Sequence, residues 1–475
     1  MDIFESGNPD DELEDSELSR RTFDEAINEL QERLHHRELS SNTVEILEEI
    51  VSLYLGHAKY AETVQFVDIL LEYLPYDAET WYRKGVALSH LDRHREALGC
   101  FQKAVSLNPA EVEFSIACGL ALDSLEQYED AIQCFDRVLE KQPSDLDALI
   151  SKVLSLERMN RWEDAANTLH SLIAMNPEQP DAWHELAFCY DVLERFEDSL
   201  RCYEQCLDDD PFNYTAWYNR GILLNKMGSF TRAIESYDFA LAIKEDFFHA
   251  WFNKGNAFAN VGRFHDAIES YKQSIRVEPE DASAWHNMGE AYEELQLFHE
   301  AIKCYTVALR YNPAHADSLF ARGYCYDSLE QIKKAYTDYC KALALQKTNP
   351  EIWYAKANAA YNLGKWREAI IAYKMAVRYD PQNVDAWLEL ADTLLEYGYY
   401  RESLKAYNKC IDVTPQWSDP YYGRAKVLFL LKKSFDAIDS FKKSFELNPE
   451  KKKEFEKEFP GVKSIKEFTN LLLAK

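Results

Sequence analysis

The sequence predicts an all-α solenoid of 34-residue helix-turn-helix repeats, and three observations support this fold class. Seven of the ten tryptophans are separated by multiples of 34 residues. Small residues and prolines recur in the same register, and glycine and proline together make up only 30 of 475 residues. A period of this length is typical of stacked helical units rather than of a single globular core. The tryptophans in register are Trp81, Trp183, Trp217, Trp251, Trp285, Trp353 and Trp387.

Eleven units with these tryptophans at the fourth place cover residues 78–451 without insertion or deletion. Place eight is glycine or alanine in every unit except one, which has Val153. Place twenty is alanine in nine units and serine in the other two, and place thirty-two is proline in nine units. The predicted parts are an acidic tail and capping helix (1–43), a degenerate first unit (44–77), eleven units (78–451) and a C-terminal capping helix (452–475).

Each unit is expected to form two amphipathic helices. In residues 248–281, apolar or small residues recur at helical spacing in two runs, which are Trp251, Gly255, Phe258 and Ala259, and then Phe264, Ala267, Ile268 and Tyr271. Gly262 lies between the runs, where a left-handed residue can end the first helix. The second helix is expected to stop near Pro279. Small residues at places eight and twenty would let paired helices approach closely.

This order of tryptophan, small residue, alanine and proline resembles the tetratricopeptide repeat family. The resemblance covers roughly four fifths of the chain. It implies an open right-handed superhelix whose first helices line the concave face. It also implies a role in binding proteins, although this scaffold serves many different partners.

The ends differ from the repeats. Thr22 and Glu25 form a capping-box pattern at the start of a predicted helix that runs to about His36. A second short helix is predicted over residues 462–474, as a solubilising cap or as a membrane-surface or partner helix. The acidic start does not resemble a signal peptide, so a cytoplasmic location is expected. The ten cysteines contain no Cys-x-x-Cys pair and are interpreted as small helix residues.

The sequence predicts no enzyme, no metal site and no cofactor. His90 and His94 stand four residues apart with Asp92 between them, a spacing that could bind a metal on one helix. They fall at a turn, so we interpret them as exposed turn residues. No phosphate-binding loop or nucleophile motif occurs.

A stripe of large residues at place five is expected along the groove. Such side chains provide contact area at a low entropic cost. The alternative is that they pack against the next unit and are largely buried. The stripe consists of Tyr82, Ile116, Ile150, His184, Tyr218, Phe252, His286, Phe320, Tyr354, Leu388 and Tyr422.

Asparagines repeat at place six in three successive units, at Asn219, Asn253 and Asn287, and Asn256 lies one helical turn beyond Asn253. A carboxamide can donate and accept at once, which matches an extended peptide backbone. The pattern resembles the asparagine ladder of peptide-binding members of the family. The alternative is that these side chains bond to a neighbouring helix or to water.

The net charge of −29 favours a basic or neutral partner and disfavours nucleic acid and anionic membranes. Glu290, Glu293 and Glu294 add an acidic cluster beside the asparagines. Plain solubility is the alternative explanation for this charge.

The predicted function is a non-catalytic scaffold or adaptor that binds an extended partner segment in the groove around residues 218–358. A self-associating structural protein, and a regulator that docks on an enzyme or transcription factor through its convex face, are the alternatives. The candidate groove residues are Asn219, Asn253, Asn256, Asn287, Tyr218, Phe252, His286, Phe320, Tyr354 and Glu290.

Overall fold

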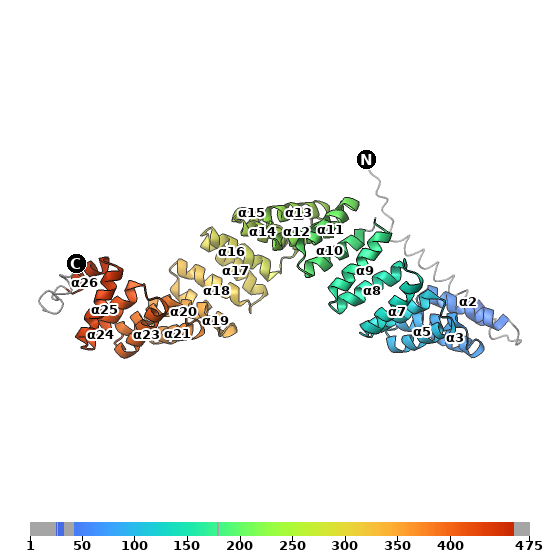
Figure 1. Cartoon of the computed structure of the whole chain (residues 1–475), viewed down its shortest axis with the longest axis horizontal. Coiled ribbons are helices and arrows are strands. Elements are labelled where there is room, and N and C mark those ends of the chain that lie inside the picture. Colours follow the sequence, from blue (N-terminus) through green and yellow to red (C-terminus); the bar gives the residue numbers. More distant parts are fainter. Residues whose placement is uncertain (1–24, 26, 33–41, 178–179, 460–475) are drawn as a thin grey trace. The chain divides into compact units, whose positions relative to one another are not determined.

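The computed structural model describes residues 25, 27–32, 42–177 and 180–459, and these residues form helices without any strand. The helices follow one another as pairs (Figure 1). They belong to two compact units, one ending at Leu223 and one starting at Leu224, with the boundary inside α12 (Tyr214–Lys226). The predicted all-α repeat fold is confirmed.

The helices of the first unit that precede α12 are α2 (Asn42–Gly56), α3 (Tyr60–Tyr73), α4 (Ala78–His90), α5 (His94–Leu107), α6 (Val112–Ser124), α7 (Tyr128–Lys141), α8 (Leu146–Arg158), α9 (Trp162–Met175), α10 (Pro180–Val192) and α11 (Phe196–Asp209).

The helices of the second unit that follow α12 are α13 (Phe230–Ile243), α14 (Phe248–Asn260), α15 (Phe264–Val277), α16 (Ala282–Glu294), α17 (Phe298–Tyr311), α18 (Ala316–Ser328), α19 (Ile332–Leu345), α20 (Pro350–Asn362), α21 (Trp366–Tyr379), α22 (Val384–Glu396), α23 (Tyr400–Val413), α24 (Ser418–Leu430), α25 (Ser434–Leu447) and α26 (Glu450–Glu458).

The turn inside each pair uses one left-handed residue at place fifteen. Gly262 has φ +76° and Gly364 has φ +71°, as expected for a glycine that ends a helix. Other units have a non-glycine residue there, such as Asn160 with φ 56° and Glu330 with φ 57°. The turn geometry is therefore kept even where the residue type is less suited to it.

An aromatic ring explains the small residue at place eight. A Cβ atom added to Gly289 would lie 2.6 Å from the Cε1 atom of Tyr305, which stands at place twenty-four on the second helix of the pair. The Tyr305 side chain is fully buried, as are Tyr271 and Tyr339 at the same place of neighbouring units. The small residue thus makes room for a ring, and the paired helices pack around that ring.

The in-register tryptophans connect successive pairs. The indole N–H of Trp251 donates to the carbonyl oxygen of Glu245 at 2.8 Å, and that of Trp285 donates to the carbonyl oxygen of Pro279 at 2.9 Å. All seven tryptophans make this bond to the residue six positions earlier, at the end of the preceding pair. The tryptophans are therefore structural.

Place twenty is fully buried. Ala301 and Ala335 have no exposed surface. Where serine replaces alanine, its hydroxyl donates to the carbonyl oxygen of the place-eight residue, from Ser199 to Ala187 at 2.7 Å and from Ser403 to Ala391 at 2.8 Å. Both serines therefore keep a hydrogen bond inside the core.

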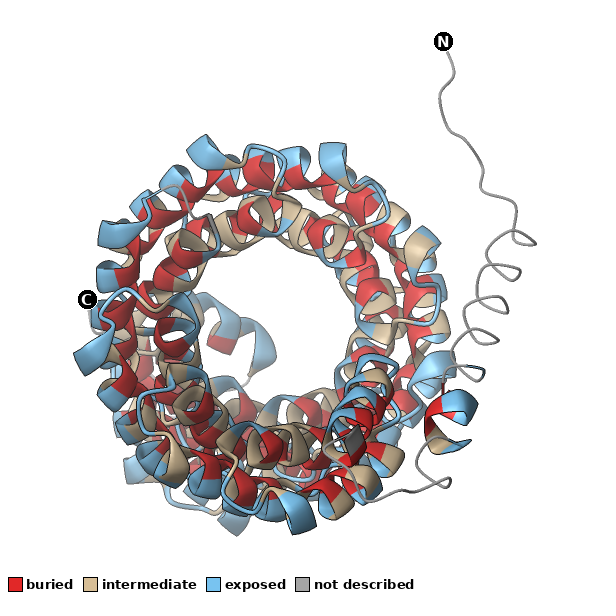
Figure 2. Ribbon diagram, turned by 90° about the vertical axis from the view of Figure 1, so that its right-hand side faces the viewer, coloured by how far each residue is buried: buried red, intermediate tan, exposed pale blue. Residues whose placement is uncertain are grey.

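Within each unit, buried residues lie between two layers of helices (Figure 2). The second helices combine buried and exposed positions, whereas the first helices carry many half-buried residues, as α14 and α16 do. The first helices therefore present a surface of partly accessible side chains, on which the candidate residues lie.

The ends match the predictions only in part. Ile27 and Leu30, in the predicted N-terminal helix, are buried against Ile46 and Ile50 of α2. Thr22 of the predicted capping box lies outside the described residues, as does the predicted helix over 462–474. Helix α26 overlaps the start of the C-terminal capping helix predicted over 452–475, and the ring centroids of its buried Phe455 and of Phe441 lie 4.5 Å apart.

We expect Ala301→Glu to lower the free energy of unfolding by several kcal/mol, because it places an unpaired carboxylate at a fully buried position. Chemical denaturation would measure the change. His299→Glu is the control, because His299 is exposed on the same helix and should alter stability by less than about 0.5 kcal/mol. Equal stabilities of the two variants would contradict this packing.

Gly289→Ala should cost about 1–3 kcal/mol, because the added methyl group overlaps the Tyr305 ring. Gly99→Ala is the matched control in helix α5, where an added Cβ meets nothing within 4 Å. That change should stabilise the protein by about 0.5–1 kcal/mol through the higher helix propensity of alanine. In thermal denaturation, the melting temperature should fall for Gly289→Ala and rise for Gly99→Ala.

Candidate functional site

The place-five residues are mostly half-buried. They are thus neither fully exposed along a groove nor fully buried against the next unit, which were the two possibilities considered from the sequence. Their rings pack on the place-twenty-four ring of the same pair. The ring centroids of Phe252 and Tyr271 lie 6.0 Å apart, and those of His286 and Tyr305 lie 5.5 Å apart. The same arrangement joins Phe320 to Tyr339 and Tyr354 to Tyr373. The stripe is therefore part of the core as well as part of the surface.

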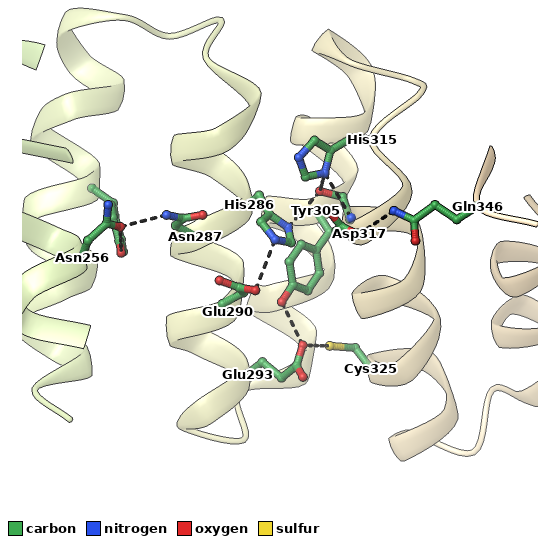
Figure 3. Close-up of polar contacts among 12 residues, drawn as sticks. Asn256, His286, Asn287, Glu290, Glu293, Tyr305, His315, Asp317, Cys325 and Gln346 are labelled. Atoms are coloured by element: carbon green, nitrogen blue, oxygen red, sulfur yellow. Dashed lines mark hydrogen bonds and ion pairs between the residues drawn. The ribbon is translucent and has the colours of Figure 1, made fainter. Parts of the chain in front are cut away.

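The asparagines bond to neighbouring helices. Asn287 Nδ2 donates to Asn256 Oδ1 at 2.8 Å, which links α16 to α14 (Figure 3). In the first unit, Asn219 Nδ2 lies 2.9 Å from His184 Nε2. Asn253 is half-buried on α14. Asn219, Asn256 and Asn287 thus each bond to a side chain on a neighbouring first helix. Such bonds were the alternative to a ladder that binds a peptide.

Asn256 has a second role that the sequence analysis missed. Its Oδ1 atom also accepts from the hydroxyl of the buried Tyr271 at 2.7 Å. Asn358 accepts from Tyr373 at 2.6 Å in the same way, and Asp392 accepts from Tyr407. A polar residue at place nine thus satisfies a buried tyrosine hydroxyl, which would otherwise carry a desolvation cost.

Four of the predicted residues line one pocket of about 590 Å³ in the second unit, which we call the central pocket. These residues are His286, Asn287, Glu290 and Phe320. Residues on α15 to α18 that the sequence analysis had not proposed for a site also line it, including Tyr305 and Tyr324. Tyr324 could have been recognised, because place nine lies one helical turn from place five.

The other predicted residues lie elsewhere. Phe252 packs beside Phe248 on α14, and Tyr354 contacts the core formed around α20 to α23. Tyr218 and Asn219 belong to the first unit, so they are not part of the central pocket.

His286 lines the central pocket and shares the hydroxyl of Ser318 with His315. His286 Nε2 lies 3.2 Å from Glu290 Oε1, and its Nδ1 lies 3.0 Å from the hydroxyl of Ser318 (Figure 3). His315 Nδ1 accepts from the backbone N–H of Ser318 at 3.1 Å, so this side chain caps α18. Burial and the nearby His286 lower the pKa of His315, which favours the neutral form that the cap requires.

Glu293 also lines the central pocket. Its Oε2 atom accepts from the Tyr305 hydroxyl at 2.8 Å and from the Cys325 thiol at 3.4 Å (Figure 3). Burial raises the pKa of Glu293 despite these two hydrogen bonds. The Cys325 bond joins two successive pairs, as the Cys189 bond to Glu157 does in the first unit. Glu293 therefore acts mainly as a buried link.

The exposed carboxylates form the rim. The Glu290 side chain is 58% exposed, and Glu294 and Asp317 are also exposed. Asp317 accepts from Gln346 Nε2 at 3.1 Å. An acidic rim around a pocket with an aromatic wall is suited to a cationic side chain.

The two histidines of the possible metal pair lie on different helices. His90 ends α4 and stacks on Tyr60 with ring centroids 4.2 Å apart, whereas His94 begins α5 and lies 3.7 Å from Asp92. In the described part of the chain, no group of three or more His, Cys, Asp or Glu residues is arranged to hold a metal ion. The cysteines are free and mostly buried, in keeping with their interpretation as helix residues.

Among the described helices, none combines the length and apolar character needed to cross a membrane.

The regular helix pairs define a helical-repeat solenoid protein. Family models match successive parts of it: "Psidin, N-terminal TPR repeats region" over residues 120–219, "TPR repeat" over 255–296, and "Tetratricopeptide repeat" over 78–110, 214–247 and 354–420. The chain belongs to the tetratricopeptide repeat family. Residues 294–376 also match the model "Anaphase-promoting complex, cyclosome, subunit 3".

The chain is also similar to several solved structures. YrrB, described as a TPR protein with an unusual peptide-binding site, is 20% identical, with 38% of this chain and 94% of YrrB covered and a TM-score of 0.37. MamA is 23% identical, with 36% and 94% covered and a TM-score of 0.34. The C-terminal part of a TPR protein from Cytophaga hutchinsonii is 20% identical, with 49% and 96% covered and a TM-score of 0.44. No curated protein matches the chain.

Proteins of this family generally act as non-catalytic scaffolds. This chain is accordingly a protein-interaction scaffold.

We expect Glu293→Gln to become more stable relative to the wild type as the pH rises from about 4 to 7. The raised pKa means that folded Glu293 holds its proton more tightly than in the unfolded chain. The contribution of Glu293 to wild-type stability therefore falls as pH rises through this range, and glutamine avoids that loss while keeping an acceptor oxygen. Denaturation at several pH values measures the effect, with Glu294→Gln as a control at an exposed neighbouring glutamate.

Proposed function

We propose that the chain is a scaffold that binds an extended segment of a protein partner along the first helices of the second unit. The central pocket would receive a lysine or arginine side chain of that segment. The acidic rim of the pocket, with Glu290 58% exposed, is the observation that carries this proposal.

The lining suits a long cationic side chain. Glu290 and Glu294 offer carboxylates at the mouth, while Phe320 and Tyr324 offer aromatic surface, with Tyr324 49% exposed. A lysine or arginine can lay its aliphatic stem along such rings while its charge meets the carboxylates.

The polar wall suits the partner's backbone. The bond to Asn256 uses one of the two N–H groups of Asn287, and the carboxamide also has an acceptor oxygen. Because this bond already orders Asn287, a peptide group would meet a side chain with little conformational freedom to lose.

The overall charge supports the same class of partner. With a net charge of −29, the chain attracts basic segments over long range, and the attraction should weaken as salt screens it. Binding should therefore become weaker between 50 mM and 500 mM salt.

Selection from a random peptide library displayed on phage would test the proposal with the full chain as bait. The wild type should enrich peptides that contain lysine or arginine. A Glu290→Gln, Glu294→Gln double variant should bind the selected peptides at least about tenfold more weakly, the size of effect expected for charge-assisted contacts.

A Glu278→Gln, Glu280→Gln variant is the matched control, because it removes two exposed carboxylates that do not line the central pocket. Its affinity should stay within about twofold of the wild type. Equal losses in both variants would mean that net charge alone attracts the peptides. Unchanged binding in both would contradict the pocket and favour docking on the second helices.

A further inference from the structure

A row of exposed apolar side chains crosses three first helices of the first unit. Leu120 on α6, Leu154 on α8 and Phe188 on α10 all stand at place nine, with 48%, 46% and 40% of their surfaces exposed. Ile150 and Val192 extend the row and are each 41% exposed. We call these five residues the apolar stripe.

The apolar stripe is not a requirement of the repeat. In the second unit the same place is polar or ionisable in every pair, with Asn256, Glu290, Tyr324, Asn358, Asp392 and Lys426. Place nine can therefore be polar without loss of the fold, so core packing does not explain why Leu120, Leu154 and Phe188 are apolar and exposed at this place in three successive pairs. An exposed apolar patch of this kind is typical of an interaction surface.

Carboxylates border the apolar stripe. Glu113, Asp147 and Asp181 stand at place two of α6, α8 and α10 and are exposed. Arg158, on the same helix as Leu154, is paired with Asp123. A segment that covers the stripe should therefore combine apolar side chains with positive charge.

We propose that residues 460–475 of a second copy of the chain bind to the apolar stripe. This segment contains the large apolar residues Val462, Ile465, Phe468, Leu471, Leu472 and Leu473. It has three lysines and one glutamate, so its side chains carry a net charge of +2 (3 − 1), in a chain whose total is −29. The segment thus has the composition that the stripe and its border require.

The other end of the chain does not fit. Residues 1–21 include Asp10, Asp11, Glu12 and Glu14, which the border carboxylates would repel. The length of the C-terminal segment is also suitable. Neighbouring helices pack about 8–10 Å apart, so three first helices present roughly 20 Å. Sixteen residues span about 24 Å as a helix and more when extended.

The proposed contact joins two copies, so it does not depend on how the two units of one chain are arranged. The apolar stripe and the segment are different surfaces, so the contact joins copies head to tail. The interaction goes beyond the proposed function, because it involves neither the central pocket nor an external partner.

Photo-crosslinking of the full chain would test the proposal. Leu154 is replaced by p-benzoylphenylalanine, and equal amounts of ordinary and ¹⁵N-labelled protein are mixed, irradiated and analysed by mass spectrometry. We expect crosslinks from position 154 to residues 460–475, about half of them between differently labelled copies. Crosslinks only within one copy, or none to this segment, would overturn the proposal. The same probe at Tyr324, an exposed place-nine residue of the second unit, should not reach the segment.

A substitution pair provides a second test. Leu472→Asp should raise the concentration at which the mass doubles in light scattering by at least tenfold, because it puts a carboxylate against the apolar stripe. Asn470→Asp adds the same charge to the same segment at a polar residue and should have at most a threefold effect. Equal effects would overturn the apolar contact. Binding of peptides to the central pocket should be unchanged in both, which separates this proposal from the proposed function.

Discussion

The packing of one aromatic ring against one small residue organises most of the helix pairs, and the pair of α8 and α9 has Val153 and Leu169 at these places instead. Where place eight is glycine, as at Gly289, the ring of the second helix lies too close for even a methyl group. The ring then supports the place-five residue, so the side chain of His286 rests on Tyr305. The core therefore positions the accessible face of the first helices. The geometry of the candidate site depends on the contact between the place-eight residue and the ring at place twenty-four.

Polar bonds add a second level of order between pairs. Glu293 accepts from Cys325 on the next pair, and Asn287 donates to Asn256 on the preceding one. These bonds hold the half-buried side chains of Asn256, Asn287 and Glu293 in defined positions. The result is an ordered wall of the central pocket, which would lower the entropic cost of the proposed peptide binding.

The 34-residue period of the sequence predicted the fold because each place in the repeat has a packing or turn requirement that involves only nearby residues. The small place-eight residues, the alanines at place twenty and the turn glycines all have the roles expected of them, with φ +76° at Gly262 as an example. The site was less predictable. Asparagines at 34-residue intervals indicated a ladder, yet Asn287 donates to Asn256, and Asn256 in turn accepts from the hydroxyl of Tyr271. The sequence does not reveal which of several polar neighbours a flexible carboxamide will choose.

The tryptophan bonds have a consequence for how the protein is made. Each joins residues only six positions apart, and the bonds between pairs described above span 31 to 35 residues. No pair therefore depends on a distant part of the sequence for these contacts. A nascent chain could complete each pair soon after the next has left the ribosome, so the array would be assembled progressively during translation, with little unsatisfied apolar surface exposed at any time.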